Sequence, residues 1–225
     1  MRLQEEIIAC TRCPRLVRYR QVIARQKKRQ FMSWEYWGAP LPGFGDTQAE
    51  LVILGLAPAA HGGNRTGRMF TGDGSASFLM RALHSAGFAN QPTSEHRHDG
   101  LEMKNAFMTA VVRCPPPQNR PSAGEIANCS SYLDMELALL RRARVVLALG
   151  RVAFKGYLDH AKRLGARIVG MRFNHGQVYR LSQDLPVLVA SYHPSRQNTQ
   201  TGRLTNVMMD HALAAVNTIL LEGGL

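Results

Sequence analysis

Four short apolar runs, rich in β-branched residues and separated by segments of helical periodicity, constrain the fold of this chain most. Near-continuous apolar runs are typical of strands buried on both faces, as in parallel sheets whose crossovers are helices. The alternation predicts an α/β fold: a three-layer α/β/α sandwich around a central four-stranded parallel sheet, formed by a single domain over residues 1–225. The expected strands are residues 51–56, 107–112, 145–149 and 187–192.

The helical segments between these strands carry start signals and a defined apolar face. Ser122 and Glu125 form a capping box, and Cys129 falls on the inward face of the helix that follows. His211 falls among the apolar residues of the last helix and is predicted to be a core residue. The expected helices span about residues 75–86, 122–140, 151–161 and 203–221.

The charge balance indicates a polyanionic partner. The chain has 28 Lys and Arg against 16 Asp and Glu, a net charge of +12, and residues 12–29 contain eight basic side chains and no acidic one. A solvated helix face is the alternative, but the whole-chain charge favours nucleic acid, and the stretch lacks the large apolar face of a membrane-surface helix. No run approaches the roughly 18 apolar residues of a membrane span. Glu5 and Glu6 stand where a secretory signal would be apolar, so we expect a cytoplasmic protein.

The four cysteines make a shared metal site plausible. Cys10 and Cys13 have the C-x-x-C spacing of two ligands to one ion, whereas Cys114 and Cys129, with fourteen residues between them, do not fit a zinc-finger register. Proline follows Cys13 and Cys114, as in ferredoxin-like iron–sulfur motifs. The alternative is a redox pair with two buried structural cysteines, but no βαβ pattern surrounds Cys10.

Ligands of parallel α/β sheets bind at the carboxyl ends of the strands, so the loops that leave those ends are the candidate functional segments. In the first loop, Gly62 and Gly67 have the spacing of a phosphate-binding loop. Arg68 and Met69 then stand where such a loop needs lysine and a hydroxyl, which argues against nucleotide hydrolysis. The three loops span residues 57–73, 113–121 and 193–199.

Two titratable residues in these loops have alternative interpretations. Asp73 stands at a helix start, where it is either a helix cap or a carboxylate that positions a water molecule. His193 directly follows the last apolar run and is expected at the rim of the sheet, although a lone histidine is more often structural than catalytic. The remaining histidines show no metal-ligand spacing.

Together these loops resemble the uracil-DNA glycosylase superfamily, and most closely its type B branch, also called family 5. The resemblance rests on GLAPAAHG at 55–62, RTGRMFTGD at 65–73 and HPSRQNT at 193–199, and extends from Cys10 to the last helix. It implies a monofunctional DNA-repair glycosylase that flips a deaminated base out of DNA and hydrolyses its N-glycosidic bond. It further implies a monomer on nucleoid DNA that needs no divalent metal for catalysis. The cysteines at 10, 13, 114 and 129 match the ligands of a [4Fe-4S] cluster in this branch.

The resemblance also assigns roles to residues by matching position. Phe70 matches the aromatic residue that stacks on the flipped base, and Ala57 falls in the base-binding segment. His193 matches the histidine that hydrogen-bonds a uracil carbonyl and stabilises the departing base. The residues expected to contact DNA are Arg65, Arg68, Ser195, Arg196, Gln197 and Asn198.

Two departures from the superfamily pattern bear on chemistry and specificity. Most relatives have Asp, Asn or Glu near the start of the first loop, whereas residues 56–58 here are Leu-Ala-Pro, so Asp73 is our candidate for orienting water or stabilising the sugar cation. Type A relatives read uracil with an Asn at the position of Ala110. Its absence predicts relaxed specificity that includes hypoxanthine and xanthine, with Asn119 as a substitute contact.

Two other functions use the same features. One is an iron–sulfur redox protein or electron carrier, and the other is a zinc-stabilised nucleic-acid-binding module without catalysis. An electron carrier does not need the net charge of +12, and a pure binding module does not need Phe70 and His193 at separate strand ends.

Overall fold

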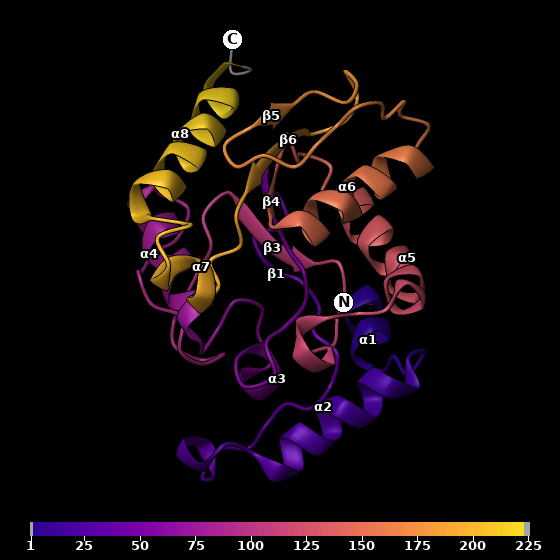
Figure 1. Ribbon diagram of the computed structural model, residues 1–225, viewed down its shortest axis with the longest axis vertical. Coiled ribbons are helices and arrows are strands. Elements are labelled where there is room, and N and C mark those ends of the chain that lie inside the picture. The colour runs from indigo at the N-terminus through magenta and orange to yellow at the C-terminus, as the bar shows by residue number, and fades with distance from the viewer. Residues whose placement is uncertain (1, 223–225) are drawn as a thin grey trace.

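The four apolar runs form the central parallel strands of the computed structural model, which describes residues 2–222 (Figure 1). Leu51 in the second strand of the chain pairs with both Ala106 and Val145, which fixes the register of three neighbouring strands. The predicted four-stranded parallel sheet is therefore confirmed, with strand ends within two residues of expectation. These strands are β2 (Leu51–Gly55), β3 (Ala106–Ala110), β4 (Val145–Leu149) and β6 (Val187–Ser191).

Two short antiparallel strands extend the sheet at its edges. β1 (Phe44–Gly45) pairs with β3, and β5 (Val178–Tyr179) pairs with β6, so the order is β1-β3-β2-β4-β6-β5. The sheet is therefore mixed and six-stranded. Strands of two residues are too short to show an alternating pattern, which explains why the sequence did not predict them.

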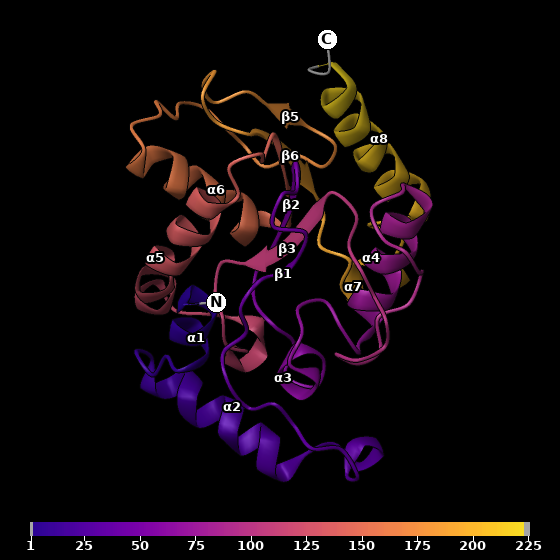
Figure 2. The ribbon, with the colours of Figure 1, turned by 180° about the vertical axis from the view of Figure 1, so that it is seen from behind.

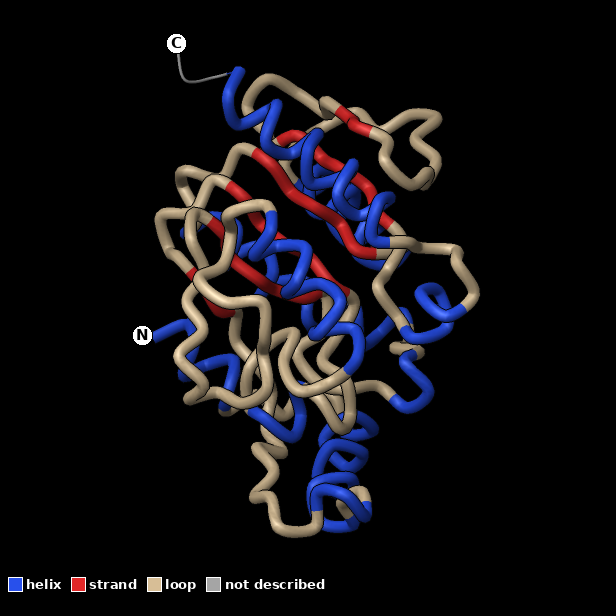
Figure 3. The backbone as a smooth tube through the Cα atoms, turned by 90° about the vertical axis from the view of Figure 1, so that its left-hand side faces the viewer, coloured by secondary structure: helices blue, strands red, loops and turns tan. Residues whose placement is uncertain are grey.

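Helices cover both faces of the sheet. Figure 3 shows α4 and α8 passing in front of the strands, and Figure 2 shows α5 and α6 on the side away from them. None of the helices in residues 2–222 has the length and apolar character needed to cross a membrane. The long helices are α1 (Arg2–Ile8), α2 (Pro14–Gln26), α4 (Gly74–Ser85), α5 (Ala123–Leu139), α6 (Arg151–Arg163) and α8 (Asn206–Glu222). Short helical segments are η1 (Arg29–Phe31), α3 (Gly63–Thr66), η2 (Pro117–Asn119) and α7 (Arg196–Gln200).

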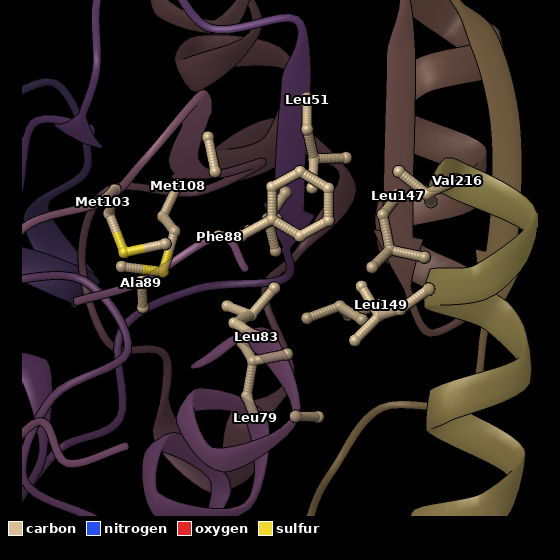
Figure 4. Packing of buried hydrophobic residues seen from close by; sticks show 14 of the residues in the cluster. Leu51, Leu79, Leu83, Phe88, Ala89, Met103, Met108, Leu147, Leu149 and Val216 are labelled. Atoms are coloured by element: carbon tan, nitrogen blue, oxygen red, sulfur yellow. The ribbon is translucent and has the colours of Figure 1, made fainter. Parts of the chain in front are cut away.

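Alternate residues of each central strand pack into opposite cores. Leu51 and Leu147 lie on the side of α4 and α8, in one core cluster with Leu79, Leu83 and Val216 (Figure 4). The next residue along each strand packs into a second cluster with α1, α5 and α6. Because both faces are covered, every residue of the four central strands is buried, and this produces the continuous apolar runs.

The predicted capping box of α5 is confirmed, and the last predicted helix is present as α8, but one core position predicted on it is wrong. The Ser122 hydroxyl accepts a hydrogen bond from the Glu125 backbone N–H (3.2 Å), the Glu125 carboxylate accepts one from Ser122 N–H (2.7 Å), and Cys129 is buried. His211 is exposed, so its prediction as a core residue is wrong. The buried stripe of α8 follows Met209, and a residue two positions further on lies about 200° around the helix.

Candidate active site

A cavity of about 660 Å³ lies where the chain leaves β2, β3 and β6. Because the carboxyl ends of parallel strands meet at one edge of a sheet, segments far apart in the sequence share its wall. The three loops expected to carry function do converge here. The cavity is lined by parts of residues 56–75, by Ala110, by residues 118–120, and by His193 and residues 195–197.

Phe70 presents a half-buried ring to the cavity from the first loop. Its φ angle is 47°, in the left-handed region, which aims the side chain back toward β2. A Cβ atom at Gly55 would lie 2.6 Å from Phe70 Cζ, so only glycine at the end of β2 leaves room for the ring. Ala57 lines the cavity beside it.

Asp73 is both a helix cap and part of the cavity wall, so the two interpretations of this residue are compatible. Its Oδ1 accepts a hydrogen bond from Ala76 N–H (2.9 Å) at the start of α4. Its Oδ2 lies against Gly62, where a Cβ atom would collide with it. Burial raises the pKa of Asp73 above its ordinary value, although backbone N–H groups and the charge of Arg65 act in the opposite direction.

His193 reaches the cavity from the end of β6. Burial lowers the pKa of the half-buried imidazole to about 4, so the ring is neutral near pH 7. Its backbone is held by Asn198, whose side-chain amide donates to the His193 carbonyl oxygen (2.8 Å). Gly150 has a φ angle of 93°, and a Cβ atom there would lie 3.2 Å from His193 Cβ, so the two strand ends approach closely. A neutral imidazole can donate one N–H to a ligand without carrying charge.

The second loop contributes three exposed side chains, Gln118, Asn119 and Arg120. The first two have an unusual backbone. Their φ angles are 54° and 56°, and two consecutive left-handed residues other than glycine are uncommon. Ala110, at the end of β3, also lines the cavity and is buried. Ala110 therefore presents only a methyl group to the cavity wall.

The segment after His193 divides into structural and exposed residues. Ser195 caps α7 and accepts a hydrogen bond from Asn198 N–H (3.3 Å). Arg196 and Gln197 are exposed at the mouth of the cavity. Ser195 and Asn198 thus fix the shape of the turn, and Arg196 and Gln197 are free to meet a ligand.

Arg65 and Arg68, which the sequence predicts to contact DNA, are buried and bind groups of the protein itself, so a DNA contact through these guanidinium groups stays a prediction. Their exposed fractions are 3% and 5%. Arg65 donates to the carbonyl oxygens of His61 and Gly72, both at 2.8 Å, and Arg68 forms an ion pair with Asp99 (2.7 Å). Arg65 therefore satisfies two backbone carbonyls of the tight loop, and Arg68 supplies the positive charge beside the Asp99 carboxylate, which also accepts hydrogen bonds from backbone N–H groups.

The four cysteines lie together in the cluster between the sheet and α1, α2 and α5. Cys10 follows α1, Cys13 precedes α2, Cys114 follows β3 and Cys129 lies in α5, and none is disulfide-bonded. Burial, together with the neighbouring Cys129 and Cys10 thiols, raises the pKa of Cys114 to about 12, although the charge and hydrogen bond of Arg20 act in the opposite direction. Within residues 2–222 no three His, Cys, Asp or Glu side chains are placed to bind one metal ion together.

Two side-chain donors, the buried Arg20 and the exposed Asn128, point at the cysteine sulfurs. Arg20 Nη1 donates to Cys114 Sγ (3.1 Å) and to the Cys10 carbonyl oxygen (3.4 Å), and Asn128 Nδ2 donates to Cys13 Sγ (3.5 Å). N–H donors and a buried cation beside sulfur stabilise thiolate charge, which is the arrangement around iron–sulfur ligands. The donor set therefore fits a thiolate-bound cluster. The burial of Arg20 could have been predicted from its spacing, because it lies four residues after the buried Leu16 and therefore on the same face of α2.

Comparison with known proteins gives the family of this chain. Residues 42–217 match the model of the uracil DNA glycosylase superfamily. The chain belongs to this superfamily. It is 49% identical over 199 residues to a type-5 uracil-DNA glycosylase of Pyrobaculum aerophilum, covering 88% of this chain and 84% of the relative. It is 47% identical to one of Thermus thermophilus, covering 91% and 90%. Identity to a type-4 uracil-DNA glycosylase of Sulfurisphaera tokodaii is 26%, covering 86% and 73%.

These relatives confirm the resemblance to the type B branch, and the match to the superfamily covers every segment that lines the cavity. Cys10 and Cys13 precede the matched residues. Gln118 lines the cavity but was not predicted from the sequence. The three prolines before it are a usable signal, because they stiffen the chain between Cys114 and the cavity.

Proposed function

We propose that this superfamily member is a monofunctional DNA glycosylase that hydrolyses the N-glycosidic bond of uracil in DNA and leaves an abasic site. One observation carries the proposal: a single cavity at the strand ends holds the aromatic Phe70, the neutral His193 and the carboxylate of Asp73. The names of the relatives, type-5 uracil-DNA glycosylases, support the same activity. The base must leave the helix to reach this cavity, which costs a few kcal/mol and least at a mispair.

Phe70 and His193 act on the base. The Phe70 ring offers a face on which a flipped base stacks. As the glycosidic bond breaks, both of its electrons leave with the base, and negative charge grows on a base carbonyl oxygen. His193, neutral at pH 7, donates an N–H to that oxygen, and a donor fixed in a half-buried site stabilises the charge more than water would.

Asp73 acts on the sugar side. The C1′–N bond breaks, a water oxygen bonds to C1′, and the water proton passes to the carboxylate of Asp73. The same carboxylate stabilises the positive charge that develops on the sugar ring. Because burial raises its pKa, Asp73 is a stronger base than an exposed aspartate.

The second loop sets the specificity of the proposed reaction. The methyl group of Ala110 makes no directional contact with a base edge, and the exposed Asn119, on the loop after β3, supplies an amide at the cavity wall. Fewer directional contacts discriminate less between bases. We therefore include hypoxanthine and xanthine among the substrates.

The exposed polar and basic residues around the cavity are proposed to contact DNA. Arg196 and Gln197 enter the groove beside the vacated position, and the basic stretch 12–29 adds charge that attracts phosphates. The proposed form is a monomer acting on nucleoid DNA in the cytoplasm.

The four cysteines are proposed to hold a [4Fe-4S] cluster through Cys10, Cys13, Cys114 and Cys129. The donors to sulfur from Arg20 and Asn128 support this assignment. Such a cluster, when bound, supplies four metal–thiolate links that join α1, α2, α5 and the loop after β3. Purified protein should show visible absorbance and about four iron and four acid-labile sulfide per chain. Stoichiometric zinc without sulfide would contradict the assignment.

The activity is tested with a labelled duplex that contains one uracil opposite guanine, incubated with chelator and then treated with alkali. We expect strand cleavage at the uracil position alone, with no cleavage of the matched thymine duplex. A hypoxanthine duplex tests the relaxed specificity in parallel. Absence of cleavage on both damaged duplexes, by protein that binds them, would overturn the proposed function and leave a nucleic-acid-binding or redox role.

A further inference from the structure

A second cavity, of about 540 Å³, lies beside the active-site cavity and shares the α3 segment with it. Gly63 lines the first cavity, and Arg65 and Thr66 line the second. In Figure 1 the chain leaves α2 at the lower end of the molecule and returns past α3 toward the sheet. Trp37 N–H donates to the Arg65 carbonyl oxygen (3.1 Å), which holds the returning segment against α3. We call this cavity the tryptophan pocket, lined by Trp34, Trp37, Arg65, His96, Arg97 and His98 among others.

The pocket combines aromatic faces with cations. The guanidinium carbon of Arg65 lies 4.0 Å from the centre of the Trp34 ring and 3.9 Å from that of Phe31. The exposed Arg97 lies 4.7 Å from the centre of the Trp37 ring. Both tryptophans are half-buried, so each has accessible ring surface. A surface of this composition binds a planar, electron-rich group with an anionic substituent.

One donor in the pocket has no partner. Arg65 is 3% exposed, its Nε and Nη2 are both hydrogen-bonded, and its Nη1 is buried without any hydrogen-bond partner among the described residues. An unpaired buried charged donor is costly, so its retention indicates an acceptor that arrives from outside.

The charge around the pocket favours an anion. Arg65 and Arg97 line it together with two histidines, and Glu35 is the one acidic side chain in the lining of the described structure. Arg65 donates a hydrogen bond to the carbonyl oxygen of His61. Burial lowers the pKa of His61, and the positive charge of the nearby Lys28 lowers it as well. The ligand therefore carries negative charge as well as a planar ring.

We propose that the tryptophan pocket is a nucleotide subsite, which takes one unpaired nucleotide of the DNA strand near the flipped base. The base stacks on Trp34 or Trp37, and its phosphate is bound by Arg97 and Arg65. This proposal rests on the proposed function in one respect, that the nucleotide belongs to DNA. The subsite also connects to the chemistry, because Arg65 Nη2 donates to the carbonyl oxygen of Gly72, the residue before Asp73.

The sequence offers a direct probe, because Trp34 and Trp37 are the only two tryptophans in the chain. Tryptophan fluorescence therefore reports on this pocket alone. We would titrate the full chain with a short single-stranded DNA of undamaged bases and follow both tryptophan emission and the anisotropy of a label on the DNA. We expect saturable quenching of the emission with the same midpoint as the anisotropy change.

Variants distinguish binding in the tryptophan pocket from non-specific attraction of DNA to positive charge. Trp34→Ala should weaken single-strand binding at least about fivefold, the lower end for loss of one base–aromatic stack, and Trp34→Phe should restore most of it. Arg97→Ala should weaken binding and reduce the salt slope by about 0.7, the value for one phosphate of a single strand. The matched control is Arg141→Ala, an exposed arginine before β4, at the opposite edge of the sheet.

Any of three outcomes would overturn the subsite. One is unchanged tryptophan emission when anisotropy shows that the DNA is bound, and another is equal loss of affinity in the Arg97 and Arg141 variants. The third is failure of single-stranded DNA to bind at all. Because the DNA is undamaged and no bond is cleaved, quenching would stand even if the excision assay failed, and excision would stand if quenching failed.

Discussion

Two segments at the mouth of the active-site cavity carry arginines, and they use them in opposite ways. In the glycine-rich loop after β2, Arg65 and Arg68 are buried and donate to groups of the protein itself. In the segment after β6, Arg196 is exposed, and its neighbours Ser195 and Asn198 provide the local hydrogen bonds. The first segment is a scaffold that positions Phe70 and Asp73, and the second is a surface that meets DNA.

The difference follows from what each backbone needs. The first loop is long and turns tightly, with Gly67 and Gly72 at φ angles of 78°, and its carbonyl oxygens have few partners in regular structure. The second segment forms a short helix whose cap is a serine, so it needs no buried cation. Basic residues near an active site therefore cannot be assigned to substrate contact until their hydrogen-bond partners are known.

Removal of Arg68 is expected to have the largest effect on stability. Burial alone would raise the pKa of Asp99, but hydrogen bonds from Arg68 and backbone N–H groups hold it well below its usual range. Arg68→Ala leaves that largely buried carboxylate without its cation, so the free energy of unfolding should fall by about 3–5 kcal/mol. Denaturant unfolding measures the change. A loss below about 0.5 kcal/mol, as for an ordinary surface substitution, would show that Arg68 contributes no more to stability than an exposed arginine.

His193→Ala tests the functional side of the comparison. Loss of one donor to the departing base should lower single-turnover excision about 10²–10³-fold. DNA affinity should stay near that of wild type, because Arg196 and Gln197 remain. His211→Ala, at an exposed position on α8 outside the cavity, is the matched control. Equal rates in the two variants would remove His193 from the chemistry.

The neutral state of His193 also predicts a pH dependence of stability. The pKa of His193 is lowered to about 4 in the folded chain, whereas an unfolded histidine binds its proton near its ordinary value of about 6.5. Stability is therefore fully present above about pH 6.5 and is lost as pH falls toward 4, with a slope of up to about 1.4 kcal/mol per pH unit from this group. Unfolding of wild type and His193→Asn at pH 7 and pH 5 measures it. If both proteins lose the same stability between pH 7 and pH 5, the pH dependence comes from groups other than His193.

Arg196→Ala is expected to have the smallest effect, and on binding only. Loss of one phosphate contact should reduce the salt slope of duplex binding by about 0.9, with affinity lowered several-fold and thermal stability unchanged. Salt titrations of wild type and variant provide the test, with Arg141→Ala as the charge-matched control. A drop in stability like that of Arg68→Ala would erase the distinction between the two segments.

The sequence predicted the elements that depend on local pattern. The four central strands follow from burial on both faces, and the capping box of α5 follows from Ser122 and Glu125 three positions apart. The convergence of Phe70, Asp73 and His193 could be predicted because parallel strands place their exits at one edge.

Features that depend on tertiary contacts could not be predicted. The burial of Arg65 and Arg68 depends on the folding of residues 72 and 99 onto the loop, and nothing in the local pattern distinguishes these arginines from Arg196. The tryptophan pocket likewise joins Trp34 and Trp37 to Arg97, about sixty residues later in the chain. β1 and β5 have two residues each, too few to show the alternating apolar pattern that predicts a strand.

The most direct test of this account is single-turnover excision of uracil from a uracil–guanine duplex by Asp73→Asn. Asparagine caps a helix about as well as aspartate, so α4 and the melting temperature should be preserved, while the charge that acts on the sugar is lost. The account predicts a rate about 10²–10⁴-fold below wild type with unchanged DNA affinity. A rate equal to wild type would show that Asp73 only caps the helix, and would contradict the assignment of the chemistry to the loop after β2.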